Sequence, residues 1–274
     1  MDDERSSSDG DSGVEPGPDA ESVRETYDRI ADHFASTREY PWPEVAAFLG
    51  REPGGGADLD DDAATLADGA GPALRSRGAE STGGSGIDAD DRAERVGLDL
   101  GCGNGRHAEL LADVTERVLA VDASAGLLRT ARERAADRGF DARLVQGDAA
   151  SLPLRGDRVD VGVYVATLHH LRPRERRVAS LSELARVLRP GGRALVSVWS
   201  TAHDRFDAAS GFDTTVDWTL PGGETLPRFY HIYDPAEFDA DLAASDLRTV
   251  DSVVSSGNCY AVVTPERGGD GSGV

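Results

Sequence analysis

The chain of 274 residues has enough material for one large domain with tails, and its composition excludes several classes of protein. Acids outnumber bases 50 to 29, every base is arginine, and two cysteines are too few for a disulfide framework or a cysteine-rich metal site. No apolar run approaches the ~20 residues that cross a bilayer, and the first residues lack the pattern of a signal peptide. We therefore expect a cytoplasmic protein. Its acidic, lysine-free composition favours a halophilic source, with GC-rich codon usage as the alternative.

The first 94 residues contain one segment with apolar residues at helical spacing and two segments in which apolar residues show no periodic spacing. Residues 1–20 and 51–94 contain mostly Asp, Gly, Ser, Ala and Pro, so we expect a disordered acidic tail and a disordered acidic insertion. Between them, apolar residues at helical spacing from Val23 to Phe34 predict a helix, and Pro43 can begin a second helix through Leu49. Residues 21–50 are thus expected to form a helical segment over the substrate site, and residues 266–274 a second tail.

From Arg95 onward, short apolar strands alternate with helices. The expected strands cover residues 96–100, 118–121, 142–146, 159–165 and 193–199, and the expected helices cover 106–113, 124–138 and 173–188. Such alternation predicts an α/β domain over 95–265, with a doubly wound, Rossmann-like, mostly parallel sheet and helices on both faces. Residues 201–227 are expected to be loops. Residues 249–254 and 260–263 could close the sheet and place an antiparallel strand at its edge.

The segment Leu98–Arg106 reads LDLGCGNGR, which predicts a strand, a glycine turn and a helix. Glycine lets the backbone turn sharply and approach a ligand, as at the nucleotide-binding corner of a doubly wound sheet. A dinucleotide-binding turn would have a third glycine where Arg106 stands, which argues against a dinucleotide-dependent oxidoreductase. Asp122 and Asp148 end the next two strands. A carboxylate at Asp122 can accept both ribose hydroxyls of a nucleoside, and its alternative role is to cap the following helix.

These motifs, together with Leu188–Gly192 before the fifth strand, resemble those of the class I S-adenosylmethionine (SAM)-dependent methyltransferases. The resemblance implies the seven-stranded sheet of that family, SAM as the cofactor, and a glycine loop facing the amino-acid end of SAM. It also implies that Asp148 meets the adenine amino group and that the end of the fourth strand faces the methyl donor. The residues expected to bind the cofactor are Asp99, Gly101, Gly103, Asn104, Asp122, Ala123, Asp148, Ala149 and Val165.

The fourth strand is followed by His169 and His170, which invite a metal or general-base role. Adjacent histidines lack the i, i+4 spacing of a zinc pair on a helix, so we expect no metal site and favour a place in the wall of the pocket. The segment also lacks the Asn/Asp-Pro-Pro-Tyr/Phe signature of enzymes that methylate exocyclic amines.

Two further motifs are similar to one subfamily of these methyltransferases, which esterifies the carboxymethyl group of a modified wobble uridine in tRNA. The first runs from Tyr27 to Arg38 and on to Pro41-Trp42-Pro43, and the second is Arg228-Phe229-Tyr230-His231. A carboxylate nucleophile is already ionised at neutral pH, so it needs cationic and hydrogen-bonding groups and no general base. The residues expected to hold it are Arg38, Arg228, Tyr230 and His231. Three of them also have a purely structural alternative role. For Arg38 this is solvation at the surface, and for Tyr230 and His231 it is packing in a polar turn.

The resemblance implies two partners, which are tRNA and a small zinc-binding activator protein at the sheet edge near Arg143–Gln146. The net acidity argues against tRNA, because nucleic-acid binders usually present a basic face. The one dense basic cluster, from Arg172 to Arg193, is either such a face or a solvated helix. Two alternatives stay open: a SAM-dependent methyltransferase acting on a small metabolite, and a non-catalytic SAM-binding regulatory subunit. No contact with a membrane is expected.

Overall fold

The computed structural model describes residues 20–51, 92 and 94–266. The two predicted disordered tails and the predicted acidic insertion lie almost wholly outside these residues. Within the described ranges no helix has the length and apolar character needed to cross a membrane. The remaining predictions for the sheet, its helices and its site can all be compared with the structure.

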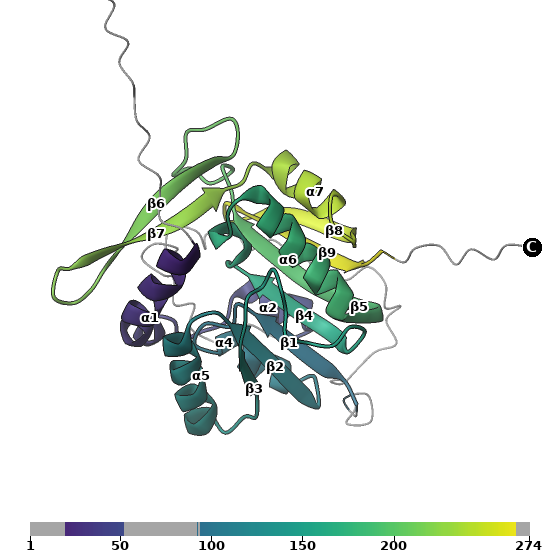
Figure 1. Ribbon diagram of the computed structural model, residues 1–274. Coiled ribbons are helices and arrows are strands. Elements are labelled where there is room, and N and C mark those ends of the chain that lie inside the picture. The colour runs from purple at the N-terminus through teal and green to yellow at the C-terminus, as the bar shows by residue number, and fades with distance from the viewer. Residues whose placement is uncertain (1–19, 52–91, 93, 267–274) are drawn as a thin grey trace, which may run out of the picture.

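Seven strands form one sheet in the order β3-β2-β1-β4-β5-β9-β8 (Figure 1). They are β1 (Val96–Leu100), β2 (Arg117–Asp122), β3 (Arg143–Gln146), β4 (Val159–Val165), β5 (Leu188–Trp199), β8 (Leu247–Ser255) and β9 (Asn258–Pro265). The first five are parallel, which confirms the predicted α/β class with a mostly parallel sheet. Strand order reverses between β1 and β4, where ligands bind in such sheets.

The antiparallel strand is β9, and it pairs with both β5 and β8. It therefore lies one strand inside the sheet, and the prediction of an antiparallel strand at the edge is wrong. The burial of the two closing strands explains their order. Strand β9 is buried along nearly all of its length, whereas most of β8 is exposed, as suits an edge strand. The other edge is β3.

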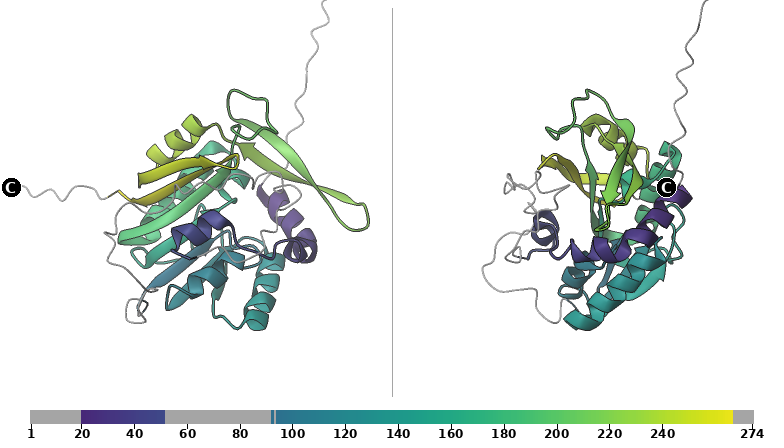
Figure 2. Two further views of the ribbon diagram at one scale, coloured as in Figure 1. Left: turned by 180° about the vertical axis from the view of Figure 1, so that it is seen from behind. Right: turned by 90° about the vertical axis from the view of Figure 1, so that its left-hand side faces the viewer.

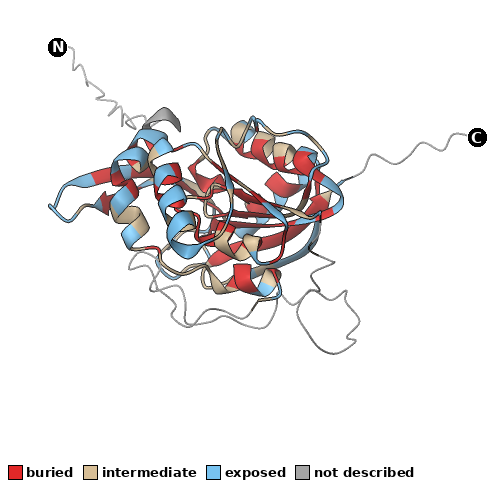
Figure 3. Ribbon diagram, turned by 90° about the horizontal axis from the view of Figure 1, so that it is seen from below, coloured by how far each residue is buried: buried red, intermediate tan, exposed pale blue. Residues whose placement is uncertain are grey.

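Helices cover both faces of the sheet, as predicted. One core packs α6 (Arg174–Val187) and α7 (Pro235–Ala243) against one face. The other core packs α2 (Pro43–Phe48), α4 (Arg106–Ala112) and α5 (Ala125–Arg138) against the opposite face. Figure 3 shows that the strands between these layers are buried and that the outer helix faces are exposed.

Residues 201–227 were expected to be loops, and that prediction is wrong for much of the segment. Strands β6 (Phe212–Thr219) and β7 (Thr225–Ile232) form a separate two-stranded antiparallel sheet. Buried Val216 and Trp218 alternate with exposed Asp217 and Thr219, the two-residue period of a half-buried strand. This hairpin projects from the main sheet beside α1 (Ala20–Ser36) (Figure 2). Helix α1 thus lies between the hairpin and α5.

Candidate active site

A cavity of about 690 Å³ opens at the carboxyl ends of the central strands, beside the reversal in strand order. Its walls come from the loops after β1, β2, β3 and β4 and from α1. Eight of the nine predicted cofactor-binding residues line it: Gly101, Gly103, Asn104, Asp122, Ala123, Asp148, Ala149 and Val165. They meet there because parallel strands bring their carboxyl ends to the same edge of a sheet.

The glycine loop has a backbone that few other residues could adopt. Gly101, Gly103 and Gly105 have φ values of +73°, +52° and +80°, in the left-handed region that favours glycine. A Cβ atom on Gly101 would lie 2.1 Å from Oγ1 of Thr167, after β4. The glycine pattern thus lets the loops after β1 and β4 approach each other at the cavity.

Asp122 joins the loops after β1 and β2. Its Oδ2 accepts a hydrogen bond from the backbone N–H of Gly103 (2.9 Å), and its Oδ1 accepts one from Ser124 (2.9 Å). Burial raises the pKa of this carboxyl above its ordinary value, and these two N–H donors oppose the rise. Each carboxylate oxygen has a second lone pair, so Asp122 can also accept hydroxyl groups from the cavity side.

Asp148 also lies at the cavity, together with an arginine that the sequence did not predict there. Oδ1 of Asp148 accepts the backbone N–H of Ala150 (2.9 Å), and Oδ2 pairs with Arg176 of α6 at 2.6 Å. Both side chains are partly exposed, so the ion pair is accessible to solvent. Arg176 thus helps to define the end of the cavity near β3.

Asp99 is the ninth predicted cofactor residue, and it does not line the cavity. Its side chain is buried beneath the glycine loop, where it accepts a hydrogen bond from the backbone N–H of Ala108 in α4. Its Oδ2 has no hydrogen-bond partner. Burial, followed by the nearby charge of Asp122, raises the pKa of Asp99 from 3.8 to about 7. The structure therefore places Asp99 behind the loop and not at the cavity surface, where a cofactor contact was expected.

The pKa of Asp99 predicts a pH-dependent effect of Asp99→Asn on stability. The folded protein holds more protons than the unfolded chain between the ordinary pKa of 3.8 and the folded value of about 7. Asp99 therefore makes the folded state less stable as the pH rises through that range. Denaturant unfolding at pH 5 and pH 8 should show the variant gaining stability relative to the parent by on the order of 2 kcal/mol at the higher pH. A difference that does not change with pH would contradict the raised pKa.

Helix α1 forms a wall of the cavity through Val23, Arg24, Tyr27 and Phe34. The helix is fixed to the loop after β2, because Oδ1 of Asp28 accepts hydrogen bonds from Oγ of Ser124 (2.7 Å) and from the N–H of Gly126 (2.8 Å). The helical spacing predicted this helix. Which side chains face the cavity depends on how the helix docks against distant loops, and the sequence pattern did not identify them.

Three of the four predicted catalytic residues lie together behind this wall, around Trp218 of β6. The guanidinium carbons of Arg38 and Arg228 lie 5.1 and 4.8 Å from the centre of the Trp218 ring. The ring of Tyr230 lies 5.3 Å from the same atom of Arg228 and stacks on Trp199 at 4.6 Å. All three side chains are buried. They do not line the cavity themselves, and Tyr27, which does, lies between the cavity and Arg228.

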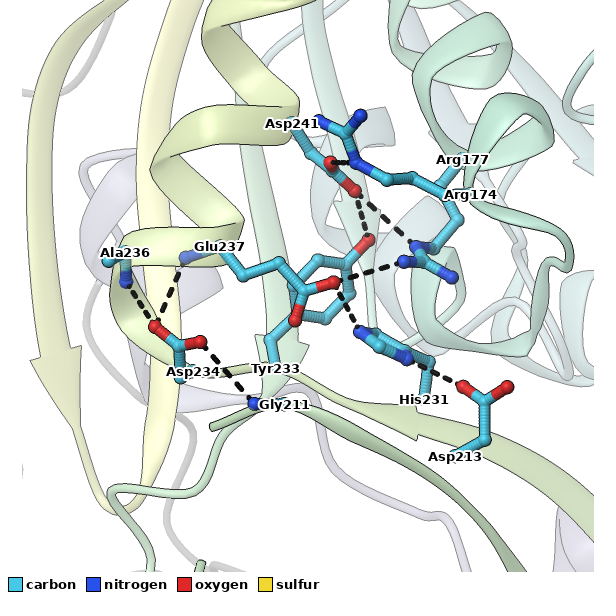
Figure 4. A network of polar contacts seen from close by, with 10 residues as sticks. All are labelled: Arg174, Arg177, Gly211, Asp213, His231, Tyr233, Asp234, Ala236, Glu237 and Asp241. Carbon is cyan, nitrogen blue, oxygen red and sulfur yellow. Dashed lines mark hydrogen bonds and ion pairs between the residues drawn. The ribbon is translucent and has the colours of Figure 1, made fainter. Parts of the chain in front are cut away.

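His231 lies on the opposite face of β7, because neighbouring side chains of a strand point to opposite sides. Its Nδ1 is 2.7 Å from Oδ1 of Asp213, and its Nε2 is 2.8 Å from Oε1 of Glu237 (Figure 4). Glu237 also pairs with Arg177, which reaches Asp241. The structure therefore does not bring His231 to the cavity. It places this residue in a polar network between the hairpin and α7.

The two histidines after β4 have different positions. His170 lines the cavity, in agreement with the favoured interpretation of this pair. His169 is buried, accepts the backbone N–H of Trp199 (3.3 Å) and does not reach the cavity. Burial lowers the pKa of both imidazoles, that of His170 to about 3, so both rings are neutral near pH 7.

The basic cluster predicted from Arg172 to Arg193 is largely neutralised by carboxylates of the same chain. Arg174 and Arg177 pair with buried Asp241, and Arg176 pairs with Asp148. Further along, Arg186 pairs with Glu183 and Arg189 with Asp160. The cluster is therefore mainly a set of intramolecular ion pairs.

The residues around the cavity fit the cofactor that the sequence motifs imply. SAM carries a sulfonium and an ammonium cation, and the carboxylates of Asp122 and Asp148 line the cavity. The unpartnered oxygen of Asp99 lies just behind the glycine loop. Gly101 and Gly103 of the glycine loop line the cavity, and Asn104 and Ser124 flank them. Asp122 would hold the ribose, and Asp148 and Ala149 the adenine.

Comparisons with known proteins identify the family of this chain. A family model described as a methyltransferase domain matches residues 98–196. A tRNA (carboxymethyluridine(34)-5-O)-methyltransferase of Saccharomyces cerevisiae is 28% identical over 216 residues, which are 76% of this chain and 60% of that protein. The mouse protein of the same name is 32% identical, over 65% of this chain and 20% of its own length. This chain thus spans about a fifth of the mouse relative.

A putative methyltransferase of Encephalitozoon cuniculi is 35% identical over 176 residues, 62% of this chain and 78% of that protein. Among solved structures, the CcbJ methyltransferase of Streptomyces caelestis has a TM-score of 0.60 at 20% identity, over 91% of this chain and all of that one. A SAM-dependent methyltransferase of Clostridium acetobutylicum has a TM-score of 0.54 at 16% identity, over 65% of this chain and 87% of the other. At these identities, the two structures support the fold. The matched domain, the relatives and the fitted cavity show that the chain belongs to the class I SAM-dependent methyltransferases and uses SAM as its cofactor.

Proposed function

We propose that this enzyme methylates the carboxylate of a carboxymethylated wobble uridine in tRNA and so forms its methyl ester. The observation that carries the proposal is the position of Arg228, a buried cation directly behind the cavity wall and 3.5 Å from the hydroxyl oxygen of Tyr27. A guanidinium suits a carboxylate, because both groups are planar and can form two parallel hydrogen bonds. The names of the curated relatives support the same acceptor.

The reaction requires little acid–base catalysis by the protein. When bound, SAM supplies an electrophilic methyl group. The acceptor carboxylate is ionised at neutral pH, so its oxygen can attack without a general base. The protein would then act by orientation and by its electrostatic setting. Arg228, with Arg38 and Tyr230 beside it, would hold the carboxylate, and Asp122 and Asp148 would hold the cofactor.

Recognition of tRNA would depend on the wobble nucleoside more than on phosphate contacts. The arginines from Arg172 to Arg189 mostly pair with carboxylates of the chain, so they add little free positive charge. This observation favours the second candidate, a small anionic metabolite as the acceptor. The predicted activator subunit stays a prediction that rests on the position of β3 at the sheet edge.

Nucleoside mass spectrometry of bulk tRNA from a deletion strain and its parent tests the proposal. We expect the wobble-uridine methyl ester to disappear in the deletion strain and the free carboxymethyl acid to accumulate. Purified enzyme and SAM should then restore the ester on that tRNA in vitro. An unchanged profile of modified nucleosides would exclude this acceptor and favour a small metabolite.

A further inference from the structure

A chain of polar contacts runs from β7 to the cavity wall through η2 (Leu168–His170) and α1. Nδ1 of His170 lies 2.8 Å from the carbonyl oxygen of Phe229, and Nε2 lies 2.9 Å from the hydroxyl oxygen of Tyr27. Nη1 of Arg228 donates to that same hydroxyl oxygen at 3.5 Å. The hydroxyl of Tyr230 also hydrogen-bonds to Tyr27. Tyr27 is therefore the point where three elements meet.

The direction of each hydrogen bond follows from the donors and acceptors that are present. A carbonyl oxygen only accepts, so Nδ1 of His170 carries the proton. The buried ring is neutral, because burial lowers the pKa of His170 to about 3. Its Nε2 is then an acceptor, and the hydroxyl of Tyr27 must donate to it. The Tyr27 oxygen keeps both lone pairs, which accept from Arg228 and Tyr230.

We infer that Tyr27 is a positioning residue for the methyl acceptor, because its oxygen holds Arg228 and Tyr230 at the wall of the cavity. The aromatic rings around Arg228 restrain the plane of its guanidinium but do not fix its rotation within that plane. The Tyr27 oxygen is one hydrogen-bond partner of Nη1 and adds to the restraint on this rotation. Tyr27 also lines the cavity, whereas Arg228 and Tyr230 do not. The charge of the acceptor comes from the proposed function, and the hydrogen bonds come from the contacts of Tyr27 with His170 and Arg228.

The test uses Tyr27→Phe, which removes the oxygen and keeps the ring that contacts Phe34 and His170 at 5.7 and 5.2 Å. We expect the SAM dissociation constant from calorimetry to change by less than about threefold. In contrast, kcat/KM for tRNA from the deletion strain should fall by about 10- to 100-fold, the cost of a misplaced orienting group. Tyr40→Phe is the matched control, and it should change neither value by more than about twofold. An unchanged kcat/KM in Tyr27→Phe, or an equal loss of SAM affinity, would overturn the inference.

A second measurement needs no acceptor and separates this inference from the proposed function. The guanidinium nitrogens of Arg228 can be followed by NMR in arginine-labelled protein and assigned from the spectrum of Arg228→Met. We expect separate Nη signals in the parent and in Tyr40→Phe, and more strongly averaged signals in Tyr27→Phe, because the loss of one hydrogen bond makes rotation of the guanidinium faster. If the parent does not methylate tRNA, the proposed function fails and these spectra decide the inference. Identical Arg228 signals in the parent and in Tyr27→Phe would then overturn it.

Discussion

Arg228→Met is expected to slow methyl transfer to a carboxylate acceptor by roughly 10²- to 10³-fold, while SAM binding stays within about threefold of the parent. The expected loss follows from removing a buried charged donor that, in the proposed function, holds the anionic reacting group. Methionine approximates the length of arginine and can pack against Trp218 and Tyr230, which now contact the guanidinium at 4.8 and 5.3 Å. The measurements are single-turnover transfer at saturating SAM, and calorimetry for the cofactor.

Two comparisons make this result specific. Arg186→Ala removes an arginine that pairs with Glu183 on α6, outside the cavity lining, and it should leave both values near those of the parent. Arg228→Lys keeps the charge but loses the planar fork, so it should recover only part of the rate. Parallel losses of transfer and SAM affinity in Arg228→Met would indicate that the variant disturbs the cavity. A rate of methyl transfer equal to that of the parent would show that Arg228 does not hold the acceptor.

The cofactor side of the cavity could be predicted because its signals are local. LDLGCGNG lies within a single strand–turn–helix unit, Asp122 ends β2, and Asp148 follows β3 by two residues. The register of a parallel sheet then brings these separate signals together. Asp99 is the exception. It belongs to the same motif, but strand alternation turns its side chain beneath the loop, where it accepts the N–H of Ala108.

The proposed acceptor side was harder to predict, because its residues meet through tertiary packing. Tyr27 lies in α1, His170 follows β4 and Arg228 lies in β7, and no sequence period links the three. For His231 a usable signal did exist. Once residues 225–232 are recognised as a strand, alternation separates Arg228 and Tyr230 from Phe229 and His231. The alternation of Val216 and Trp218 with polar residues in β6 indicates that hairpin.

Asp241→Ala is expected to lower the free energy of unfolding by about 3–5 kcal/mol, the usual cost of removing one partner from a buried ion pair. Asp241 is fully buried, and its carboxylate receives hydrogen bonds from Nε of Arg174 (2.6 Å), Nε of Arg177 (3.4 Å) and the hydroxyl of Tyr233 (3.0 Å). Its removal would leave Arg177, whose side chain is only 5% exposed, with Glu237 as its carboxylate partner. Chemical denaturation gives the free energy, and the thermal midpoint should fall by roughly 10 °C or more.

Arg174→Ala is the matched control, because Arg174 pairs with the same carboxylate but is half exposed. In this variant Asp241 keeps Arg177 and the hydroxyl of Tyr233 as partners, so we expect a clearly smaller loss of stability than in Asp241→Ala. Equal losses in the two variants would contradict a buried charge network centred on Asp241. The network has a consequence for the active site, because Glu237 links Arg177 to His231 on β7. The strand that presents Arg228 and Tyr230 on one face is thus held to α7 from the other, so His231 lies in a structural contact next to the proposed acceptor site.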